Sequence, residues 1–120
     1  MTATFYPSLR FRDADAAIAF LGEAFGFEAG DVHRGDDGRV QHAELWLQGA
    51  AIMLGEGESP SPHSAYAAVD ELDALYERAR AAGAELVREL QETPYGSREF
   101  SARDPEGNTW HFGTYRAARP

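Results

Sequence analysis

Two helix signals in this 120-residue chain stand at the same spacing in its two halves. Asp13, a residue type that caps helices, precedes a stripe of apolar residues at helical period that stops at Gly26. Asp70 precedes a second such stripe that stops at Gly83, and the distance from aspartate to glycine is the same in both halves. Around each helix the pattern predicts one strand before it and three strands after it. This self-similarity favours an internal duplication over two unrelated α+β halves.

The boundaries of the predicted strands follow from the alternation of apolar and polar residues. In the first half we predict strands over residues 6–12, 27–34, 40–48 and 51–54. In the second half we predict strands over residues 64–69, 84–90, 96–103 and 108–112. Residues 55–62 have the Gly, Ser and Pro content of a linker. The predicted fold class is α+β, in which a single domain over residues 1–120 consists of two duplicated βαβββ modules, 1–58 and 59–120.

The last predicted hairpin has the clearest turn signal. Asp104-Pro105-Glu106-Gly107 places Asp, Pro and Gly where a type I turn prefers them. In the strand that follows, Trp110 and Phe112 point to one face, whereas Thr109 and His111 point to the other. We therefore predict that one face of this hairpin joins the core and that the other carries a histidine on a polar surface.

The other predicted strands divide their faces in the same way. Their apolar faces should pack on the two helices. The opposite faces mix aromatic residues, methionine and histidine with charged residues: Tyr6, Ser8, Arg10, His42, Glu44, Trp46, Met53, Tyr66, Glu99, Ser101, Thr109 and His111. Such a mixture is typical of a concave binding surface. The alternative is a solvated face with a few isolated aromatic side chains.

Composition narrows the classes of partner. A formal net charge of −9 argues against a nucleic-acid partner, because binding to phosphates depends on clustered Lys and Arg. The same charge would attract a cationic ligand, although acidity also favours solubility in general. The chain has no cysteine, which excludes disulfides, thiolate nucleophiles and Cys-ligated zinc. It has neither an apolar run that could span a bilayer nor a signal-peptide pattern, so we expect a cytoplasmic protein without a membrane partner.

Several segments carry a resemblance to a known family. The segment P-Y-G-S-R-E-F-S-A-R-D-P-E-G-N-T-W-H-F, over residues 94–112, is similar to the ending of bleomycin-resistance proteins. Residues 9–27 and 68–76 resemble the vicinal oxygen chelate superfamily, which includes glyoxalase I, those resistance proteins and extradiol dioxygenases. G-R-V-Q-H-A-E-L-W-L, over residues 38–47, is similar to its PhnB-like branch. The resemblance implies paired βαβββ modules whose sheets form a cup-shaped mixed sheet, usually completed in a homodimer.

The resemblance also indicates where a metal would bind. Enzymes of the superfamily hold a divalent metal through one residue on the first strand and one on the last strand of each module, normally His, Glu or Gln. These positions correspond here to Tyr6, Met53, Ser64 and His111. Only His111 offers a nitrogen ligand, and a thioether suits these metals poorly. Because a catalytic centre needs about three protein ligands, we predict no metal, no cofactor and no catalytic residue at these positions.

A non-standard metal site is the alternative. His42 and Glu44 lie two residues apart on one strand face, where they could join His111 to hold a metal or act as an acid-base pair. The simpler interpretation is a hydrogen-bonded pair on the wall of the cup. His33 lies near a predicted turn and is expected to be solvated.

The predicted function is metal-free binding of a small aromatic or cationic natural product, as in bleomycin-type resistance by sequestration. Trp46, Tyr66 and Tyr95 are candidates for stacking on a planar or cationic ligand. Tyr95 stands where the bleomycin-binding proteins carry a Trp in the motif P-W-G-R-E-F. The predicted ligand-binding residues are Tyr6, Ser8, His42, Glu44, Trp46, Met53, Ser64, Tyr66, Tyr95, Glu99, Ser101 and His111. The alternatives are a metal-dependent lyase, isomerase or dioxygenase, and a regulatory or interaction module.

Overall fold

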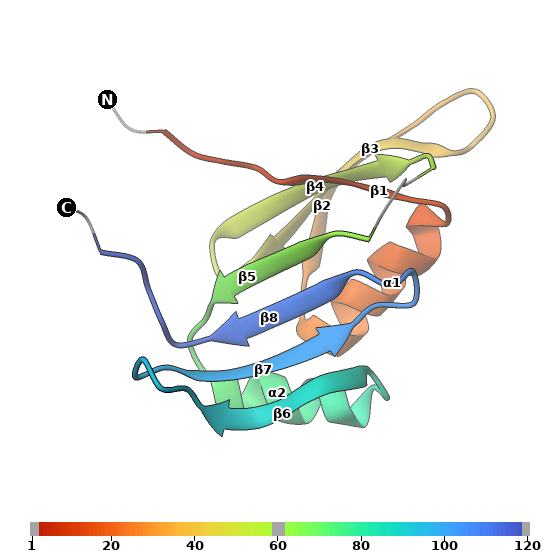
Figure 1. The fold of residues 1–120 in the computed structure, drawn as a ribbon. Coiled ribbons are helices and arrows are strands. Elements are labelled where there is room, and N and C mark those ends of the chain that lie inside the picture. Colours follow the sequence, from red (N-terminus) through yellow and green to blue (C-terminus); the bar gives the residue numbers. More distant parts are fainter. Residues whose placement is uncertain (1–2, 59–61, 119–120) are drawn as a thin grey trace.

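The protein consists of two four-stranded mixed sheets that lie side by side, with both helices on one side of them (Figure 1). The computed structural model describes residues 3–58 and 62–118. The first module contains β1 (Ser8–Phe11), α1 (Ala14–Phe25), β2 (Glu28–Arg34), β3 (Val40–Leu47) and β4 (Ala50–Glu56). The second contains β5 (Ser64–Ala68), α2 (Leu72–Ala81), β6 (Glu85–Glu92), β7 (Arg98–Arg103) and β8 (Thr109–Gly113). The predicted α+β fold with two βαβββ modules is confirmed.

The two sheets have the same topology. Their strand orders are β1-β4-β3-β2 and β5-β8-β7-β6, and in each the first and last strands of the module pair in parallel. Ser8 pairs with Met53 across β1 and β4, and Tyr66 pairs with His111 across β5 and β8. Ser8 stands as far before the first residue of α1 as Tyr66 stands before the first residue of α2. Met53 and His111 are therefore equivalent positions of the duplicated module.

A single hydrophobic core connects the two modules. The apolar strand faces are buried as predicted, among them Leu9, Phe11, Ala43, Leu45, Ile52, Leu54, Phe100, Ala102, Trp110 and Phe112. Helix α1 packs on its own sheet, and Phe25 at its end also contacts Phe112 of β8, with ring centroids 4.8 Å apart. Burying one such side chain contributes about 1.5–3 kcal/mol. Within the described ranges, neither helix is long and apolar enough to cross a membrane.

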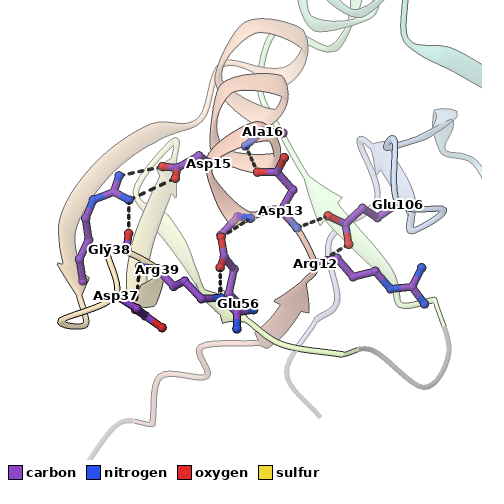
Figure 2. Close-up of polar contacts among 11 residues, drawn as sticks. Arg12, Asp13, Asp15, Ala16, Asp37, Gly38, Arg39, Glu56 and Glu106 are labelled. Atoms are coloured by element: carbon purple, nitrogen blue, oxygen red, sulfur yellow. Dashed lines mark hydrogen bonds and ion pairs between the residues drawn. The ribbon is translucent and has the colours of Figure 1, made fainter.

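Side chains at the start of α1 confirm the predicted cap (Figure 2). The Asp13 carboxylate accepts the backbone N–H of Ala16 at 3.0 Å. Glu56, from the end of β4, accepts the N–H of Ala14 at 3.2 Å through one oxygen and Arg39 Nε at 2.6 Å through the other. The helix ends at Gly26, which adopts the left-handed conformation that the stop requires, with φ of 86°.

Each module sends a hairpin turn to the start of the other module's helix. Glu106, in the β7–β8 turn, accepts the backbone N–H groups of Arg12 and Asp13 at 2.7 and 2.9 Å (Figure 2). Gln48, in the β3–β4 turn, accepts the N–H of Asp70 at 2.7 Å and donates to its carbonyl at 2.9 Å. These reciprocal contacts join the two modules within one chain.

The predicted cap of the second helix is wrong. Glu71, not Asp70, is the cap residue of α2; it has φ of 56° and makes no capping bond with its side chain. The backbone of Asp70 is bound by the Gln48 amide, and its carboxylate lies 3.3 Å from Arg116 Nη2. Asp70 therefore contacts the other module and does not cap α2, and the equal aspartate-to-glycine spacings do not mark equivalent residues.

Several predicted boundaries also need correction. Strand β1 begins at Ser8, because Pro7 has no N–H to donate to a ladder, and Tyr6 lies outside it. The predicted linker starts too early, since Gly55 and Glu56 extend β4 by pairing with β1. Within the rest of the predicted linker, residues 59–61 lie outside the described ranges. Strand β7 begins at Arg98, which leaves Tyr95 in the β6–β7 turn.

The contact between the β7–β8 turn and α1 predicts a measurable loss of stability. We expect Glu106→Ala to lower the free energy of unfolding by about 1–2 kcal/mol, because it removes the acceptor of two N–H groups at a helix start. Urea denaturation measures this change. Glu58→Ala is the matched control: Glu58 pairs with Arg12 but its side chain is 85% exposed, so the loss should stay below about 0.5 kcal/mol. Equal effects of the two substitutions would contradict the assigned role of Glu106.

Candidate functional site

Five of the predicted ligand-binding residues come together on the second module: Tyr66, Tyr95, Glu99, Ser101 and His111. They lie on the face of the second sheet that turns away from the helices, in strands β5, β7 and β8 and in the β6–β7 turn. Tyr95 Oη donates to Glu99 Oε2 at 2.7 Å. Ser101 Oγ and His111 Nδ1 are 2.6 Å apart, within hydrogen-bond distance. Strand alternation and pairing register thus assemble a compact polar group from residues that are far apart in sequence.

Glu99 is the unusual member of this group. Only 6% of it is exposed, although it lies on the face opposite the core. Among the described residues, none of the ion pairs involves Glu99. Its hydrogen bond with Tyr95 raises the pKa of the tyrosine hydroxyl, because the phenol donates to the carboxylate. A buried carboxylate with so little compensation is costly, which is typical of a functional position.

A glycine in β8 allows the aromatic side chains to approach this carboxylate. A Cβ atom on Gly113 would lie 2.6 Å from Glu99 Cγ and 2.7 Å from Tyr66 Oη. The hydroxyl of Tyr66 donates to the carbonyl of Tyr115 at 2.7 Å, and burial raises its pKa. The rings of Tyr95 and Tyr115 meet edge to face, with centroids 5.9 Å apart. We refer to Tyr66, Tyr95, Glu99 and Tyr115 as the tyrosine–carboxylate cluster.

Sequence reasoning missed two contributors to this cluster, Gly113 and Tyr115. The signal for Gly113 was its place at the end of a strand, where alternation turns it to the same face as His111. Tyr115 lies beyond the last strand and carried no such signal. Two hydrogen bonds fix its position. The Thr114 N–H donates to the Arg98 carbonyl at 3.1 Å, and the Tyr115 N–H donates to the Ser97 hydroxyl at 3.1 Å.

The predicted residues of the first module form a second, separate wall. Glu44 and Trp46 lie over Gly30, where an added Cβ would be 3.3 Å from Glu44 Oε1 and 3.0 Å from Trp46 Nε1. His42 lies beside His33 of β2, with ring centroids 6.0 Å apart. His33 is exposed, as predicted, but its proximity to His42 was not foreseen.

Met53 pairs with both Ser8 and Glu44, so these residues form one row across the first sheet. Ser8 and Ser64 line a small cavity of about 100 Å³ between β1 and β5. Tyr6 is 45% exposed in the segment before β1.

A larger cleft of about 650 Å³ separates the modules where β4 begins and β5 ends. Its apolar lining includes Phe5, Pro7, Ile52, Ala65, Ala67 and Trp110. Gln48, Asp70 and Arg116 supply polar groups. Tyr66 also lines the cleft, so the cleft adjoins the tyrosine–carboxylate cluster. The volume lies within the usual range for small-molecule sites, about 300–1,000 Å³.

The residues at the superfamily's metal positions do not fit a metal ion. They offer a phenol, a thioether, a hydroxyl and one imidazole, whose Nδ1 atom is already within hydrogen-bond distance of Ser101. The ligands of the alternative, non-standard metal site belong to different modules, because His42 and Glu44 lie on β3 and His111 lies on β8. Across residues 3–58 and 62–118, no three His, Asp or Glu side chains are grouped so that they could hold one ion.

The fold and the duplicated sheets define a class of protein, and comparison with known proteins agrees. Residues 4–112 match the Glyoxalase/Bleomycin resistance protein/Dioxygenase superfamily. The chain belongs to this superfamily. It is 34% identical over 122 residues to a protein of Mycobacterium tuberculosis (strain ATCC 25618 / H37Rv) that is named Uncharacterized protein Rv0887c; the match covers 89% of this chain and 71% of that protein.

Solved structures show the same architecture. TioX from Micromonospora sp. ML1 is 27% identical, with a TM-score of 0.85, and the match covers 96% of this chain and 100% of that one. The fosfomycin resistance protein FosX from Listeria monocytogenes is 18% identical, with a TM-score of 0.75 and coverage of 97% and 95%. At that identity the similarity to FosX shows the fold alone.

Proposed function

We propose that this protein binds a small aromatic or cationic molecule on the open faces of its sheets without the help of a metal ion, as in resistance by sequestration. The observation that carries the proposal is the tyrosine–carboxylate cluster. Glu99 is buried without a cationic partner among the described residues, beside Tyr66 and Tyr95, which are 42% and 61% exposed. Tyr115, which is 50% exposed, packs against Tyr95. A bound molecule would cover the exposed rings and compensate the buried charge.

The metal-dependent alternative lacks comparable support. Its best ligand, His111, is equivalent in position to Met53, and neither Tyr6 nor Ser64 is a strong metal ligand. Sequestration needs no reacting group. Burial and stacking alone withdraw the ligand from solution, and binding energy is all that such a function requires.

We also propose that the protein is a homodimer whose second copy covers part of the open face. Phe5 is 88% exposed and Trp46 is 39% exposed, which leaves large aromatic surface uncovered in one chain. Sedimentation velocity at micromolar concentration should give the mass of two chains. A monomer under these conditions would contradict the proposed assembly but not the binding site.

A ligand screen tests the proposed function. Chelator-treated protein is exposed to a broad panel of aromatic and cationic compounds, including bleomycin-like glycopeptides, and its melting temperature is measured. We expect at least one compound to bind with a Kd below about 100 μM, which corresponds to about −5.5 kcal/mol. The proposal fails if no compound of the panel reaches that affinity.

A further inference from the structure

We propose that the ligand is an amphiphilic organic cation, with an alkylated ammonium group at Glu99 and an apolar body in the cleft between the modules. The inference rests on the proposed function and narrows it to one class of ligand. It depends on a single juxtaposition: Tyr66 lines the cleft, and its hydroxyl end lies over Gly113 beside Glu99. One molecule seated against Tyr66 therefore touches both the cluster and the cleft.

The charge of Glu99 selects a cationic head group. Its Oε2 atom accepts from Tyr95, and among the described residues its Oε1 atom has no hydrogen bond. Every completely buried side-chain oxygen or nitrogen in the described ranges has a partner, so Oε1, which has none, keeps some contact with solvent, where a ligand can reach it. A buried carboxylate gains most from a charged partner that arrives with little water attached.

The surroundings favour an alkylated ammonium over a metal ion. Tyr95 donates to the carboxylate, Tyr66 Oη and Glu99 Cγ lie close to the same point above Gly113, and the Tyr115 ring packs against that of Tyr95. Aromatic faces attract organic cations within about 6 Å of the ring centre. A metal ion would need several oxygen or nitrogen ligands, which the described residues do not group. Two arginines near the cluster disfavour a second positive charge on the ligand. Arg116 pairs with Asp70 at 3.3 Å, and the positive charge of Arg88, on β6, lies close enough to Tyr95 to act on the pKa of its hydroxyl.

The cleft selects the rest of the molecule. Its walls are formed mainly by apolar side chains of both modules, and Phe5 and Tyr66 supply its exposed aromatic surface. The polar groups of the cleft bind one another: Gln48 bonds to the backbone of Asp70, and Arg116 pairs with the Asp70 carboxylate. An uncharged aromatic or aliphatic body therefore fits this space better than a polar one.

Calorimetric titration with three probes measures separately how much the ammonium head group and the apolar body contribute to affinity. The probes are tetramethylammonium, 1-naphthylmethanol and (1-naphthylmethyl)trimethylammonium, titrated into the whole protein. We expect the aromatic ammonium to bind roughly tenfold or more tightly than either of the others, because only it uses both the carboxylate and the cleft. Equal affinity of the alcohol and the aromatic ammonium would overturn the inference and leave small-molecule binding intact.

Two substitutions assign the contacts. Glu99→Gln should weaken both ammonium probes roughly tenfold or more and leave the alcohol unchanged. Glu89→Gln, which removes the same charge from an exposed position on β6, is the matched control. Ala50→Leu, at an exposed position that lines the cleft, should weaken both naphthyl probes but not tetramethylammonium.

A third variant separates charge from structure. Tyr95→Phe keeps the ring and frees Glu99 Oε2, so it should bind the ammonium probes at least as tightly as the natural protein. Unchanged ammonium affinity in Glu99→Gln would overturn the inference. If the cleft is filled by a second copy of the chain, the aromatic ammonium will bind no better than tetramethylammonium, which also overturns it. If neither these probes nor any compound of the screening panel binds, both this inference and the proposed function are contradicted.

Discussion

Replacing Asp104 by alanine should lower the free energy of unfolding by about 3–5 kcal/mol, the largest loss that we expect from one substitution. Asp104 opens the turn between β7 and β8 and is only 4% exposed. Its carboxylate accepts the backbone N–H groups of Glu106 and Asn108 at 2.9 and 3.1 Å. It also accepts Asn108 Nδ2 and Trp110 Nε1, each at 3.0 Å. Alanine would leave all of these donors without their acceptor.

The same turn presents Glu106 to α1, so the loss should extend beyond the hairpin to the contact between the modules. Urea denaturation measures the change. Asp73→Ala is a suitable control, because Asp73 pairs with Arg98 at the surface and its side chain is 70% exposed, so its loss should cost about 1 kcal/mol or less. A loss below about 1 kcal/mol for Asp104→Ala would show that water replaces the carboxylate at little cost.

Gly113→Ala should reduce ligand affinity roughly tenfold or more and lower the free energy of unfolding by about 1–3 kcal/mol. The added methyl would lie 2.6 Å from Glu99 Cγ and 2.7 Å from Tyr66 Oη, distances that real side chains do not tolerate. Either the carboxylate or the tyrosine must move, and each movement disassembles the tyrosine–carboxylate cluster. Calorimetric titration with a ligand from the screen measures the first effect, and urea denaturation measures the second.

Gly57→Ala is the matched control for this substitution. Its added Cβ would have Arg10 Cδ as its nearest neighbour, at 3.5 Å, which is ordinary van der Waals contact. Neither glycine has the positive φ that makes alanine unfavourable for backbone reasons. Unchanged affinity in Gly113→Ala would mean that the ligand does not use the cluster at all.

The elements and their faces were predictable because both depend on local patterns. Strand alternation placed Phe100 in the core and Glu99 toward the cup, and the Asp-Pro-Glu-Gly turn was confirmed by the bond of Gly107 N–H to the Asp104 carbonyl, 3.0 Å. The cap of α2 was not predictable in this way. Glu71 is the cap residue, and Gln48, from the other module, binds the backbone of Asp70; no local pattern predicts a partner so distant in sequence.

Strand alternation predicted which sheet face a side chain joins, but it did not predict how deeply that side chain is buried. Glu99 and Ser101 were expected to face the cup, and they do, but their burial to 6% and 1% exposure was not foreseen. Alternation states which face a side chain joins and says nothing of what covers it. Tyr95, which bonds to Glu99, lies in a turn, and the segment after β8 is held by bonds of Thr114 and Tyr115 to Arg98 and Ser97, so both positions depend on tertiary contacts. The cluster therefore became visible only in three dimensions.

The most direct test of metal-free binding compares one affinity under two conditions. The tightest ligand of the screen is titrated into protein treated with a chelator and into protein supplied with zinc, nickel, iron or manganese. Binding by the tyrosine–carboxylate cluster predicts the same Kd in chelator-treated and in metal-supplied protein. It also predicts that His111→Ala changes this Kd by the same small factor under both conditions. Binding that appears only with added metal and disappears in His111→Ala would contradict it.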